Sequence, residues 1–228
     1  MSAEELKQAA AYRALEFISS GMVVGLGSGS TARYAVLGLG KRLREGTLRD
    51  IVAVPTSEET AELARREGIP LTTLEEHPRI AVTIDGADEV DPFLNVIKGG
   101  GGCLLREKIV AYATEREIIV VDESKMSERL GLKSSVPVEV VRFGWRSTEA
   151  ALARTGARTV LRCVGGIPYV TDEGHYIIDC TYEGGIAAPA ELAVALNMIP
   201  GVVEHGLFLG LAKAVVVASP GKVEILER

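Results

Sequence analysis

The sequence predicts an α/β protein with a doubly wound, mainly parallel sheet and a smaller inserted α+β domain. Three observations favour this class. Short apolar runs alternate with helical patterns through the first half of the chain, the order of elements changes near residue 132, and two further apolar runs close the sequence. We therefore expect a Rossmann-like domain over 1–131 with 206–228, and a second domain over 132–205.

The first domain is expected to begin with an amphipathic helix. Ser2 and Glu5 have the spacing of a capping box, and apolar residues then recur at helical spacing until Gly21. Helices are also predicted at three later stretches, 31–45, 58–67 and 103–114, with Ser57 as an N-cap. Between the helices lie five mostly continuous apolar runs, typical of strands covered on both faces: 22–26, 51–54, 80–84, 94–97 and 118–121.

The second domain shows a different order of elements. Strand and helix patterns follow one another as β-α-β-β-α-β, which is the ferredoxin-like order. A hairpin turning at Asp172-Glu173-Gly174 is expected to connect the second and third strands. The elements are a strand at 138–141, a helix at 148–155, strands at 159–163 and 176–180, a helix at 189–197 and a strand at 202–205. The runs 214–218 and 223–226 are expected to return to the first sheet as strands.

Composition and charge narrow the class of function. The net charge of −6 argues against non-specific nucleic-acid binding, which needs Lys and Arg to neutralise phosphates. No apolar run reaches the roughly 20 residues that cross a bilayer, and the N-terminus lacks the features of a signal peptide, so a cytoplasmic location without membrane contact is expected. The three cysteines and three histidines are scattered and have no metal-ligand spacing.

Polar residues follow the expected strands at their carboxyl ends, where open parallel sheets bind ligands. Glycine, hydroxyl, carboxylate and ammonium groups should therefore meet at one edge. The segments are 27–31, 56–57, 85–89, 98–102 and 122–125. The first of them, within Gly25-Leu26-Gly27-Ser28-Gly29-Ser30-Thr31, has the glycines and hydroxyls of a phosphate-binding turn. It matches neither the dinucleotide fingerprint nor the Walker A loop, and a tight capped turn without a ligand is the alternative.

The other segments carry groups suited to proton transfer. Four consecutive glycines after Lys98 indicate that some group approaches the backbone closely. Glu107 is expected in the first turns of the next helix, where the helix terminus favours an ionised carboxylate suited to act as a base. Three carboxyl groups, Asp85, Asp88 and Glu89, crowd one strand end, and they indicate either proton handling or, less favoured, a Mg²⁺ site.

Taken together, these segments resemble the type A ribose-5-phosphate isomerases. The resemblance rests on Gly25 to Thr31, Asp85-Gly86-Ala87-Asp88-Glu89, Lys98-Gly99-Gly100-Gly101, Leu105-Arg106-Glu107-Lys108 and Asp122-Glu123-Ser124-Lys125. Further similarity at 137–140 and 200–208 extends it over essentially the whole chain. One departure is Ser28, where Thr is common in the family; the hydroxyl is kept.

The resemblance implies interconversion of ribose 5-phosphate and ribulose 5-phosphate in the pentose phosphate pathway, without a cofactor or an obligatory metal, by a homo-oligomer that is commonly a homodimer. It implies Glu107 as the catalytic base of a cis-enediol mechanism, with Asp85 and Lys98 as further catalytic groups. Lys98 with the amides of Gly99 and Gly100 would stabilise the enediolate. The implied substrate-binding residues are Ser28, Gly29, Ser30, Thr31, Asp85, Gly86, Ala87, Asp88, Lys98, Gly99, Gly100, Gly101 and Lys125, and Lys7 is a further candidate for the phosphate.

Two other functions stay open at this stage. A sugar-phosphate sensor related to transcription regulators would normally carry a helix-turn-helix and a basic face, and neither pattern is present. A CoA transferase-like domain would need a glutamate nucleophile in a different glycine context.

Overall fold

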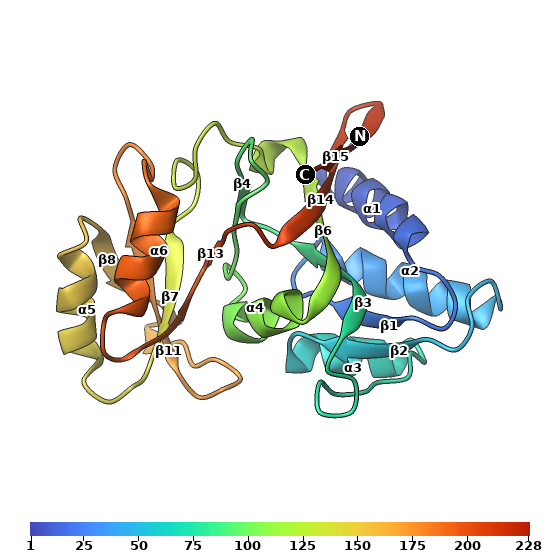
Figure 1. Ribbon diagram of the computed structural model, residues 1–228, viewed down its shortest axis with the longest axis horizontal. Helices are drawn as coiled ribbons and strands as arrows, with labels where there is room; N and C mark the ends of the chain where they lie inside the picture. The colour runs from blue at the N-terminus through green and yellow to red at the C-terminus, as the bar shows by residue number, and fades with distance from the viewer. The chain divides into compact units, whose positions relative to one another are not determined.

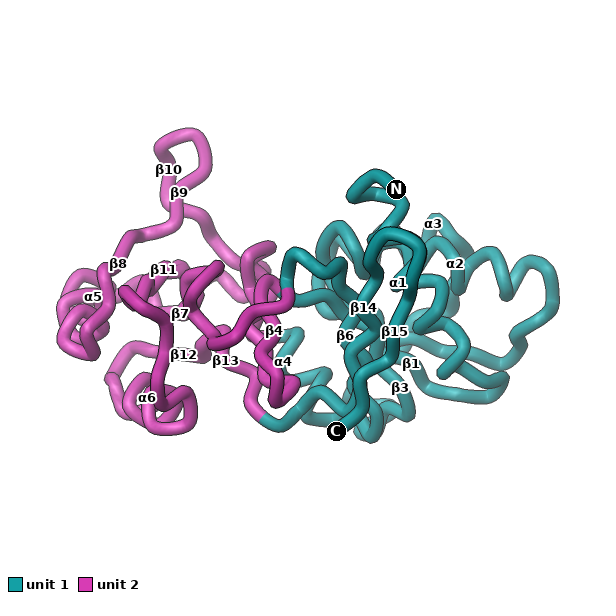
Figure 2. The backbone as a smooth tube through the Cα atoms, turned by 90° about the horizontal axis from the view of Figure 1, so that it is seen from above, with its two compact units in different colours: residues 1–87, 106–125, 210–228 teal, residues 88–105, 126–209 magenta.

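The computed structural model describes all 228 residues and divides into two compact units (Figure 2). Unit 1 comprises residues 1–87, 106–125 and 210–228, and unit 2 comprises residues 88–105 and 126–209. We expected residues 88–105, 126–131 and 206–209 in the first domain, but they group with unit 2. No helix has both the length and the apolar character needed to span a membrane.

Unit 1 contains a six-stranded sheet in the order β15-β14-β6-β3-β1-β2 (Figure 1). Five strands are parallel and β15 pairs antiparallel with β14 at one edge. The strands are β1 (Val23–Leu26), β2 (Val52–Pro55), β3 (Ile80–Gly86), β6 (Thr114–Asp122), β14 (Ala212–Ser219) and β15 (Lys222–Glu227). The two terminal strands therefore complete the first sheet, as predicted.

Helices cover both faces of this sheet, which confirms the doubly wound α/β class. They are α1 (Ala3–Ala14), α2 (Ala32–Arg44), α3 (Glu58–Arg66) and α4 (Leu104–Tyr112), with short 3-10 turns η1 (Leu15–Phe17) and η2 (Glu123–Lys125). Val24 packs in the main cluster with residues of α1 and α2, whereas its neighbour Val23 packs in a cluster with Val54 and with Val110 of α4. Adjacent strand residues point to opposite faces, so α4 covers the face opposite α1 and α2.

Local signals in the sequence set the helix starts. The Ser2 N–H donates to the Glu5 carboxylate at 2.6 Å and the Glu5 N–H donates to Ser2 Oγ at 3.2 Å, which is the predicted capping box. The N–H of Thr60 donates to Ser57 Oγ at 3.1 Å, so Ser57 caps α3 as predicted.

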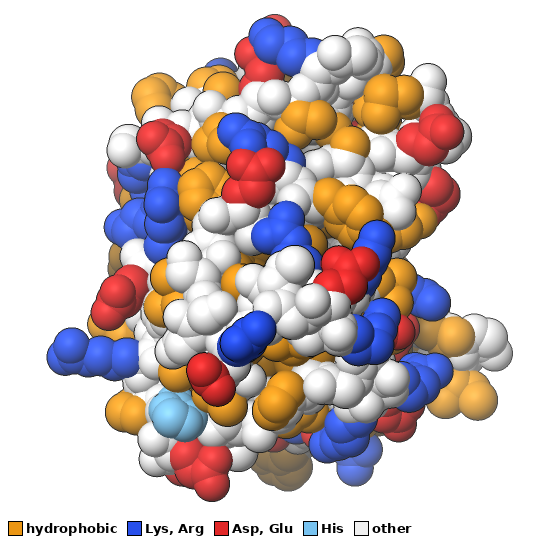
Figure 3. All heavy atoms as spheres, turned by 90° about the vertical axis from the view of Figure 1, so that its right-hand side faces the viewer, with side chains coloured by type: hydrophobic (Ala, Val, Ile, Leu, Met, Phe, Trp, Pro, Cys, Tyr) orange, Lys and Arg blue, Asp and Glu red, His pale blue; other side chains and the backbone are white.

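Acidic and basic side chains are interspersed on the face drawn in Figure 3, which shows no basic stripe of the kind that follows a nucleic-acid backbone.

Unit 2 contains a four-stranded antiparallel sheet in the order β12-β7-β11-β8. Numbered within the domain, this order is 4-1-3-2, and two helices complete the predicted ferredoxin-like arrangement. The elements are β7 (Val136–Val140), α5 (Trp145–Ala153), β8 (Arg158–Leu161), β11 (Tyr176–Thr181), α6 (Pro189–Asn197) and β12 (Val202–His205). A hairpin of β9 (Cys163–Val164) and β10 (Ile167–Pro168) projects between β8 and β11 and was not predicted (Figure 2).

The predicted strand at 94–97 is wrong in length and in partner. Only β5 (Val96–Ile97) forms, and it pairs antiparallel with β4 (Glu89–Val90) and β13 (Leu207–Phe208) in a three-stranded sheet. The Asn95 N–H and side-chain amide both donate to the Asp91 carboxylate, which closes a tight turn between β4 and β5. A parallel strand needs a crossover of a dozen or more residues, and the few residues after β3 leave no room for one.

Candidate active site

The order of strands in unit 1 reverses at β1 and β3, because the chain runs from β1 outward to β2 and then returns to the other side of β1. This switch point is where doubly wound sheets bind ligands. The carboxyl end of β1 leads into Gly27 and Ser28, and β3 ends at Asp85 and Gly86. Predicted site residues lie here on both strands: Ser28 and Gly29 begin the loop after β1, and Asp85 and Gly86 end β3.

Asp85 is fully buried and is held by backbone amides. Its Oδ1 accepts the N–H of Ser28 at 3.1 Å and the N–H of Gly86 at 2.7 Å. A Cβ on Gly27 would lie less than 3.0 Å from the Asp85 carboxyl group, so glycine is required there for packing inside the protein. The first glycine loop thus orients a carboxylate, which its sequence pattern did not reveal.

The hydroxyl of Ser28 belongs to a cluster of four hydroxyl groups. Ser28 Oγ lies 2.8 Å from the hydroxyl of Thr56, 2.7 Å from that of Ser57 and 3.1 Å from that of Thr60. Thr56, Ser57 and Thr60 are buried. The cluster ties the turn after β1 to the turn after β2, so it fixes the edge of the switch point.

The rest of the first loop is open to solvent. Gly29 and Ser30 are exposed, and both line a cavity of about 610 Å³ with Arg33 and Arg66. Thr31 is half-buried at the N-cap of α2, but its hydroxyl makes no capping hydrogen bond. Glu4 and Glu59 line the same cavity and offset the charge of the two arginines. The features that suit an anionic ligand group are therefore the exposed hydroxyls and backbone at the helix start.

Glu107 lies in the first turn of α4 and is only 5% exposed. Lys125 is half-buried in η2, directly after β6. Lys7, the additional phosphate candidate, forms an ion pair of 2.7 Å with Glu4.

Lys98 belongs to unit 2 and is buried, with 2% of its surface exposed. Its ammonium group lies 5.6 Å from the centre of the Phe208 ring, and its backbone N–H donates to the Gly206 carbonyl at 2.9 Å. A Cβ on Gly206 would lie less than 3.0 Å from the Lys98 carbonyl oxygen. The close pairing of β5 with β13 therefore requires glycine at position 206. These contacts place a lysine in the interior at the start of the glycine loop 99–102.

Three of the four glycines in loop 99–102 are required by neighbours within the protein. A Cβ on Gly99 would meet Leu104, one on Gly100 would lie 2.5 Å from Asp88 Oδ1, and one on Gly102 would meet Tyr169. Gly101 has no neighbouring heavy atom within 4 Å of such a Cβ. The sequence indicated that some group lies close to this backbone. At three of the four glycines that group is a side chain of the protein itself.

The expected use of the Gly100 amide in the oxyanion site is not supported by this geometry. The N–H of Gly100 donates to Asp88 Oδ2 at 2.7 Å and is therefore already occupied. Asp88, half-buried beside the half-buried Ala87, instead fixes the loop.

Glu89 has a structural role that the sequence did not indicate. Its carboxylate is fully buried and accepts four backbone N–H groups, those of residues 131–134, at 3.0 to 3.2 Å. The carboxylate thus supplies the hydrogen-bond acceptors that these four backbone N–H groups would otherwise lack.

No group of three or more His, Cys, Asp or Glu side chains is arranged to hold a metal ion.

Sequence reasoning also missed Arg162 and Asp179. Arg162 Nη1 donates to the carbonyls of Gly99 at 2.8 Å and Gly100 at 3.1 Å, and its other nitrogens contact Asp179. The available signal was an arginine near the end of the strand expected at 159–163.

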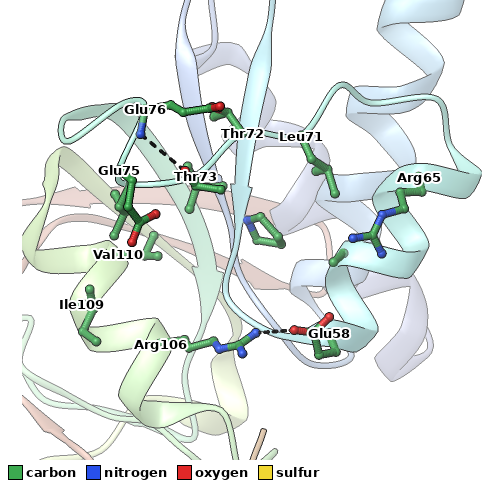
Figure 4. Close-up of a pocket in the computed structure, with 14 residues that line it drawn as sticks. Glu58, Arg65, Leu71, Thr72, Thr73, Glu75, Glu76, Arg106, Ile109 and Val110 are labelled. Atoms are coloured by element: carbon green, nitrogen blue, oxygen red, sulfur yellow. Dashed lines mark hydrogen bonds and ion pairs between the residues drawn. The ribbon is translucent and has the colours of Figure 1, made fainter. Parts of the chain in front are cut away.

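A further cavity of about 660 Å³ contains none of the predicted site residues (Figure 4). It is lined by α3, the segment 71–76 and the face of α4 that carries Arg106, Ile109 and Val110. Arg106 donates to Glu58 at 2.8 Å across it. Much of its lining is apolar, so it fits a polar phosphosugar less well than the switch point does.

A doubly wound sheet with a buried aspartate at its switch point is typical of an α/β enzyme that binds a small polar ligand. The model of the family described as ribose 5-phosphate isomerase A (phosphoriboisomerase A) matches residues 52–222. The chain belongs to this family and is an isomerase. Family membership excludes the sensor and the CoA transferase as descriptions of this chain.

Relatives match along nearly their whole length. The ribose-5-phosphate isomerase A of Gloeobacter violaceus is 56% identical, with 99% of this chain and 97% of the relative covered. That of Roseiflexus castenholzii is 53% identical, with 97% and 94% covered. A solved D-ribose-5-phosphate isomerase in complex with phospho-erythronic acid has a TM-score of 0.97 at 42% identity, and the Plasmodium falciparum ribose 5-phosphate isomerase has 0.96 at 38%. These structures cover 100% and 99% of both chains compared.

Proposed function

We propose that this enzyme interconverts D-ribose 5-phosphate and D-ribulose 5-phosphate through a cis-enediol, as a step of the non-oxidative pentose phosphate pathway, with Glu107 as the base. Buried Glu107 in the first turn of α4 is the observation that carries the assignment. The relatives named above are ribose-5-phosphate isomerases, which supports the same substrate pair.

The reaction needs one group that accepts and returns a proton. In the open-chain aldose the C2 proton is acidic because it lies beside the C1 carbonyl. The Glu107 carboxylate removes it, the C2–H electron pair forms the C1=C2 bond, and the carbonyl pair moves onto O1. After a proton passes from O2 to O1, Glu107 returns its proton to C1 and the ketose carbonyl forms at C2.

Asp85 is the proposed relay for the proton between O1 and O2 and assists opening of the furanose ring. Two backbone N–H donors at Oδ1 support this role, because they fix the orientation of the carboxylate before substrate binds. Lys98 is proposed to stabilise the negative charge of the enediolate. Its burial supports the role, since a charge interaction is stronger when water is excluded.

The remaining proposed contacts hold the substrate. Exposed Gly29 and Ser30, with Thr31 and Lys125, are suited to the phosphate, while Asp88 and the neighbouring backbone suit the sugar hydroxyls. Ser28 acts mainly by fixing the switch point through its hydroxyl cluster. The reaction is proposed to need neither a cofactor nor a metal.

The test is the rate of ribulose 5-phosphate formation by wild type and Glu107→Gln. We expect kcat to fall by at least about 10³-fold, because the amide cannot accept the proton. Glu115→Gln, an exposed glutamate on β6, is the matched control and should leave kcat within about twofold. An active Glu107→Gln enzyme would remove the base assignment, and loss of turnover with a chelator would remove the metal-free mechanism.

We also propose a homodimer and a cytoplasmic location. Val164 and Ile167, exposed apolar residues that pair across the β9–β10 hairpin of unit 2, support association of this unit with a second copy. Light scattering should give twice the chain mass for wild type and a lower mass for the double variant Val164→Ser with Ile167→Ser.

The proposed cytoplasmic location is supported by the charged phosphosugar substrate, which does not cross membranes unaided. Fractionation of the source cells tests it.

A further inference from the structure

Two residues at the base of the β9–β10 hairpin contact the glycine loop 99–102, and all belong to unit 2. Arg162 Nη1 donates to the Gly99 carbonyl at 2.8 Å and to the Gly100 carbonyl at 3.1 Å. The Tyr169 hydroxyl lies 3.5 Å from the Gly101 carbonyl, and its ring occupies the space where a Cβ on Gly102 would be. The carbonyl groups of the loop therefore face the hairpin base.

Arg162 is itself held on all sides. Its Nε donates to Asp179 Oδ2 at 2.9 Å and its Nη2 to Oδ1 at 2.5 Å, a bidentate pair. Its backbone N–H donates to the Ile177 carbonyl at 2.8 Å, and its carbonyl accepts the Tyr169 N–H at 2.9 Å. With 16% of its side chain exposed, the guanidinium has one orientation, and Nη1 is left to face the loop.

The hydrogen bonds from Arg162 to the loop determine the direction of the Gly101 N–H. No peptide bond of the chain is cis, and in a planar trans peptide the N–H points opposite to the C=O. Because the Gly100 carbonyl faces Arg162, the Gly101 N–H points away from it. The N–H groups of the neighbours are occupied, Gly100 by Asp88 and Gly102 by the Gly99 carbonyl. The Gly101 N–H donates to no group of the chain.

We propose that Arg162, aligned by Asp179, is a positioning residue that presents the Gly101 N–H to the charged oxygen of the enediolate. The inference rests on the proposed function, in which Lys98 at the start of the same loop stabilises that charge. A glycine loop has many accessible conformations, so a fixed donor requires an external group to select one of them. Arg162 does so through two successive carbonyls.

The Gly101 N–H is proposed to act only on the reacting oxygen. The positioning role of Arg162 can therefore be distinguished from a purely structural role in stabilising unit 2. An interaction made mainly in the transition state changes kcat and leaves KM nearly unchanged. Lysine at position 162 keeps the charge but cannot bridge Asp179 and two carbonyls together. Asp179→Asn weakens the alignment but leaves the guanidinium in place.

The experiment compares Arg162→Met, Arg162→Lys and Asp179→Asn with Arg158→Met, an exposed arginine on β8 that serves as the matched control. The readouts are kcat and KM for ribose 5-phosphate, inhibition by phospho-erythronic acid, and the thermal unfolding midpoint. The inhibitor's planar carboxylate carries charge similar to that of the enediolate, so its affinity should follow transition-state stabilisation.

We expect Arg162→Met to lower kcat roughly 10- to 100-fold and to weaken inhibitor binding by a comparable factor, with KM within about threefold. Arg162→Lys and Asp179→Asn should have intermediate values, and Arg158→Met should equal wild type. A kcat for Arg162→Met within twofold of the control would overturn the proposal. So would losses of kcat that simply follow the unfolding midpoint across the three variants.

The proposed function is tested separately by wild type and Glu107→Gln. If wild type does not convert ribose 5-phosphate, the function fails. If wild type is active and Arg162→Met is unaffected, only the positioning role fails. Should Arg162→Met not fold, Arg162→Lys and Asp179→Asn supply the same comparison, because each keeps one partner of the ion pair.

Discussion

Two adjacent glycines in loop 99–102 should respond in opposite ways to the same substitution. A Cβ on Gly100 would lie 2.5 Å from Asp88 Oδ1 and 3.0 Å from both Cγ and Oδ2 of that carboxyl group. Gly101 has no heavy atom within 4 Å of the new methyl, and its φ is not positive. Gly100→Ala is therefore the perturbation, and Gly101→Ala is the control one residue away.

The magnitude follows from the contact that Gly100→Ala breaks. Asp88 must withdraw by about 1 Å to reach an ordinary van der Waals distance. It then loses the charge-assisted hydrogen bond of 2.7 Å from the Gly100 N–H, which is worth about 1.5–3 kcal/mol. Gly101→Ala removes backbone freedom from the unfolded chain and should be neutral or stabilising by up to about 1 kcal/mol. The two variants should differ by roughly 2–4 kcal/mol in unfolding free energy.

Thermal unfolding followed by circular dichroism measures this difference. For a chain of this size about 1 kcal/mol shifts the midpoint by roughly 2–4 °C, so the Gly100→Ala midpoint should lie about 4–16 °C below that of Gly101→Ala. Equal midpoints, or a lower midpoint for Gly101→Ala, would refute the assignment of Gly100 to internal packing. Steady-state kinetics on Gly101→Ala adds a second result, since a methyl against bound substrate should raise KM although the midpoint does not fall.

Three further substitutions test other parts of the structure. Ser28→Ala removes the shared hydroxyl of its cluster and should cost about 1–2 kcal/mol by urea unfolding, whereas Ser28→Thr should stay within about 1 kcal/mol of wild type. Glu89→Gln faces an amide NH₂ toward backbone donors and should lower stability by about 2–4 kcal/mol; a loss below 0.5 kcal/mol would contradict the four-amide assignment. Burial raises the pKa of Glu139 above its ordinary value of 4.5 despite its contact with His175, so folding shifts its equilibrium toward the neutral carboxyl. The stability it contributes is present below pH 4.5 and lost as pH rises through the folded pKa. As pH rises above 4.5, the unfolding midpoint should therefore fall less for Glu139→Gln than for wild type, and parallel curves would disprove this.

Local sequence signals were sufficient for much of the fold. The capping box at Ser2 and the Ser57 N-cap depend on contacts between residues three apart, so the sequence alone specifies them. The continuous apolar runs of β1, β3 and β6 predicted buried parallel strands for the same reason, because their burial on two faces is a property of each run. The ferredoxin-like order of unit 2 was readable from the succession of elements.

The short strands and their pairing partners could not be predicted from local patterns. The run 94–97 looked like a central strand, yet the turn closed by Asp91 placed β5 in a separate antiparallel sheet. The β9–β10 hairpin has only two residues in each strand, too few to give a periodic signal. Pairing of these strands depends on partners far away in the chain, such as β13 for β5.

The amino-acid sequence by itself determined which side chains are available: Glu107 near a helix start, Asp85 after a strand, and Lys98 before four glycines. Only the tertiary structure decided what each of them contacts. The carboxylates of the 85–89 segment separate into an amide-held Asp85, a loop-fixing Asp88 and a structural Glu89, and Arg162 reaches the glycine loop from more than 60 residues away. The physical reason is that hydrogen bonds of a buried group are set by long-range packing, which a local pattern of residue types does not encode.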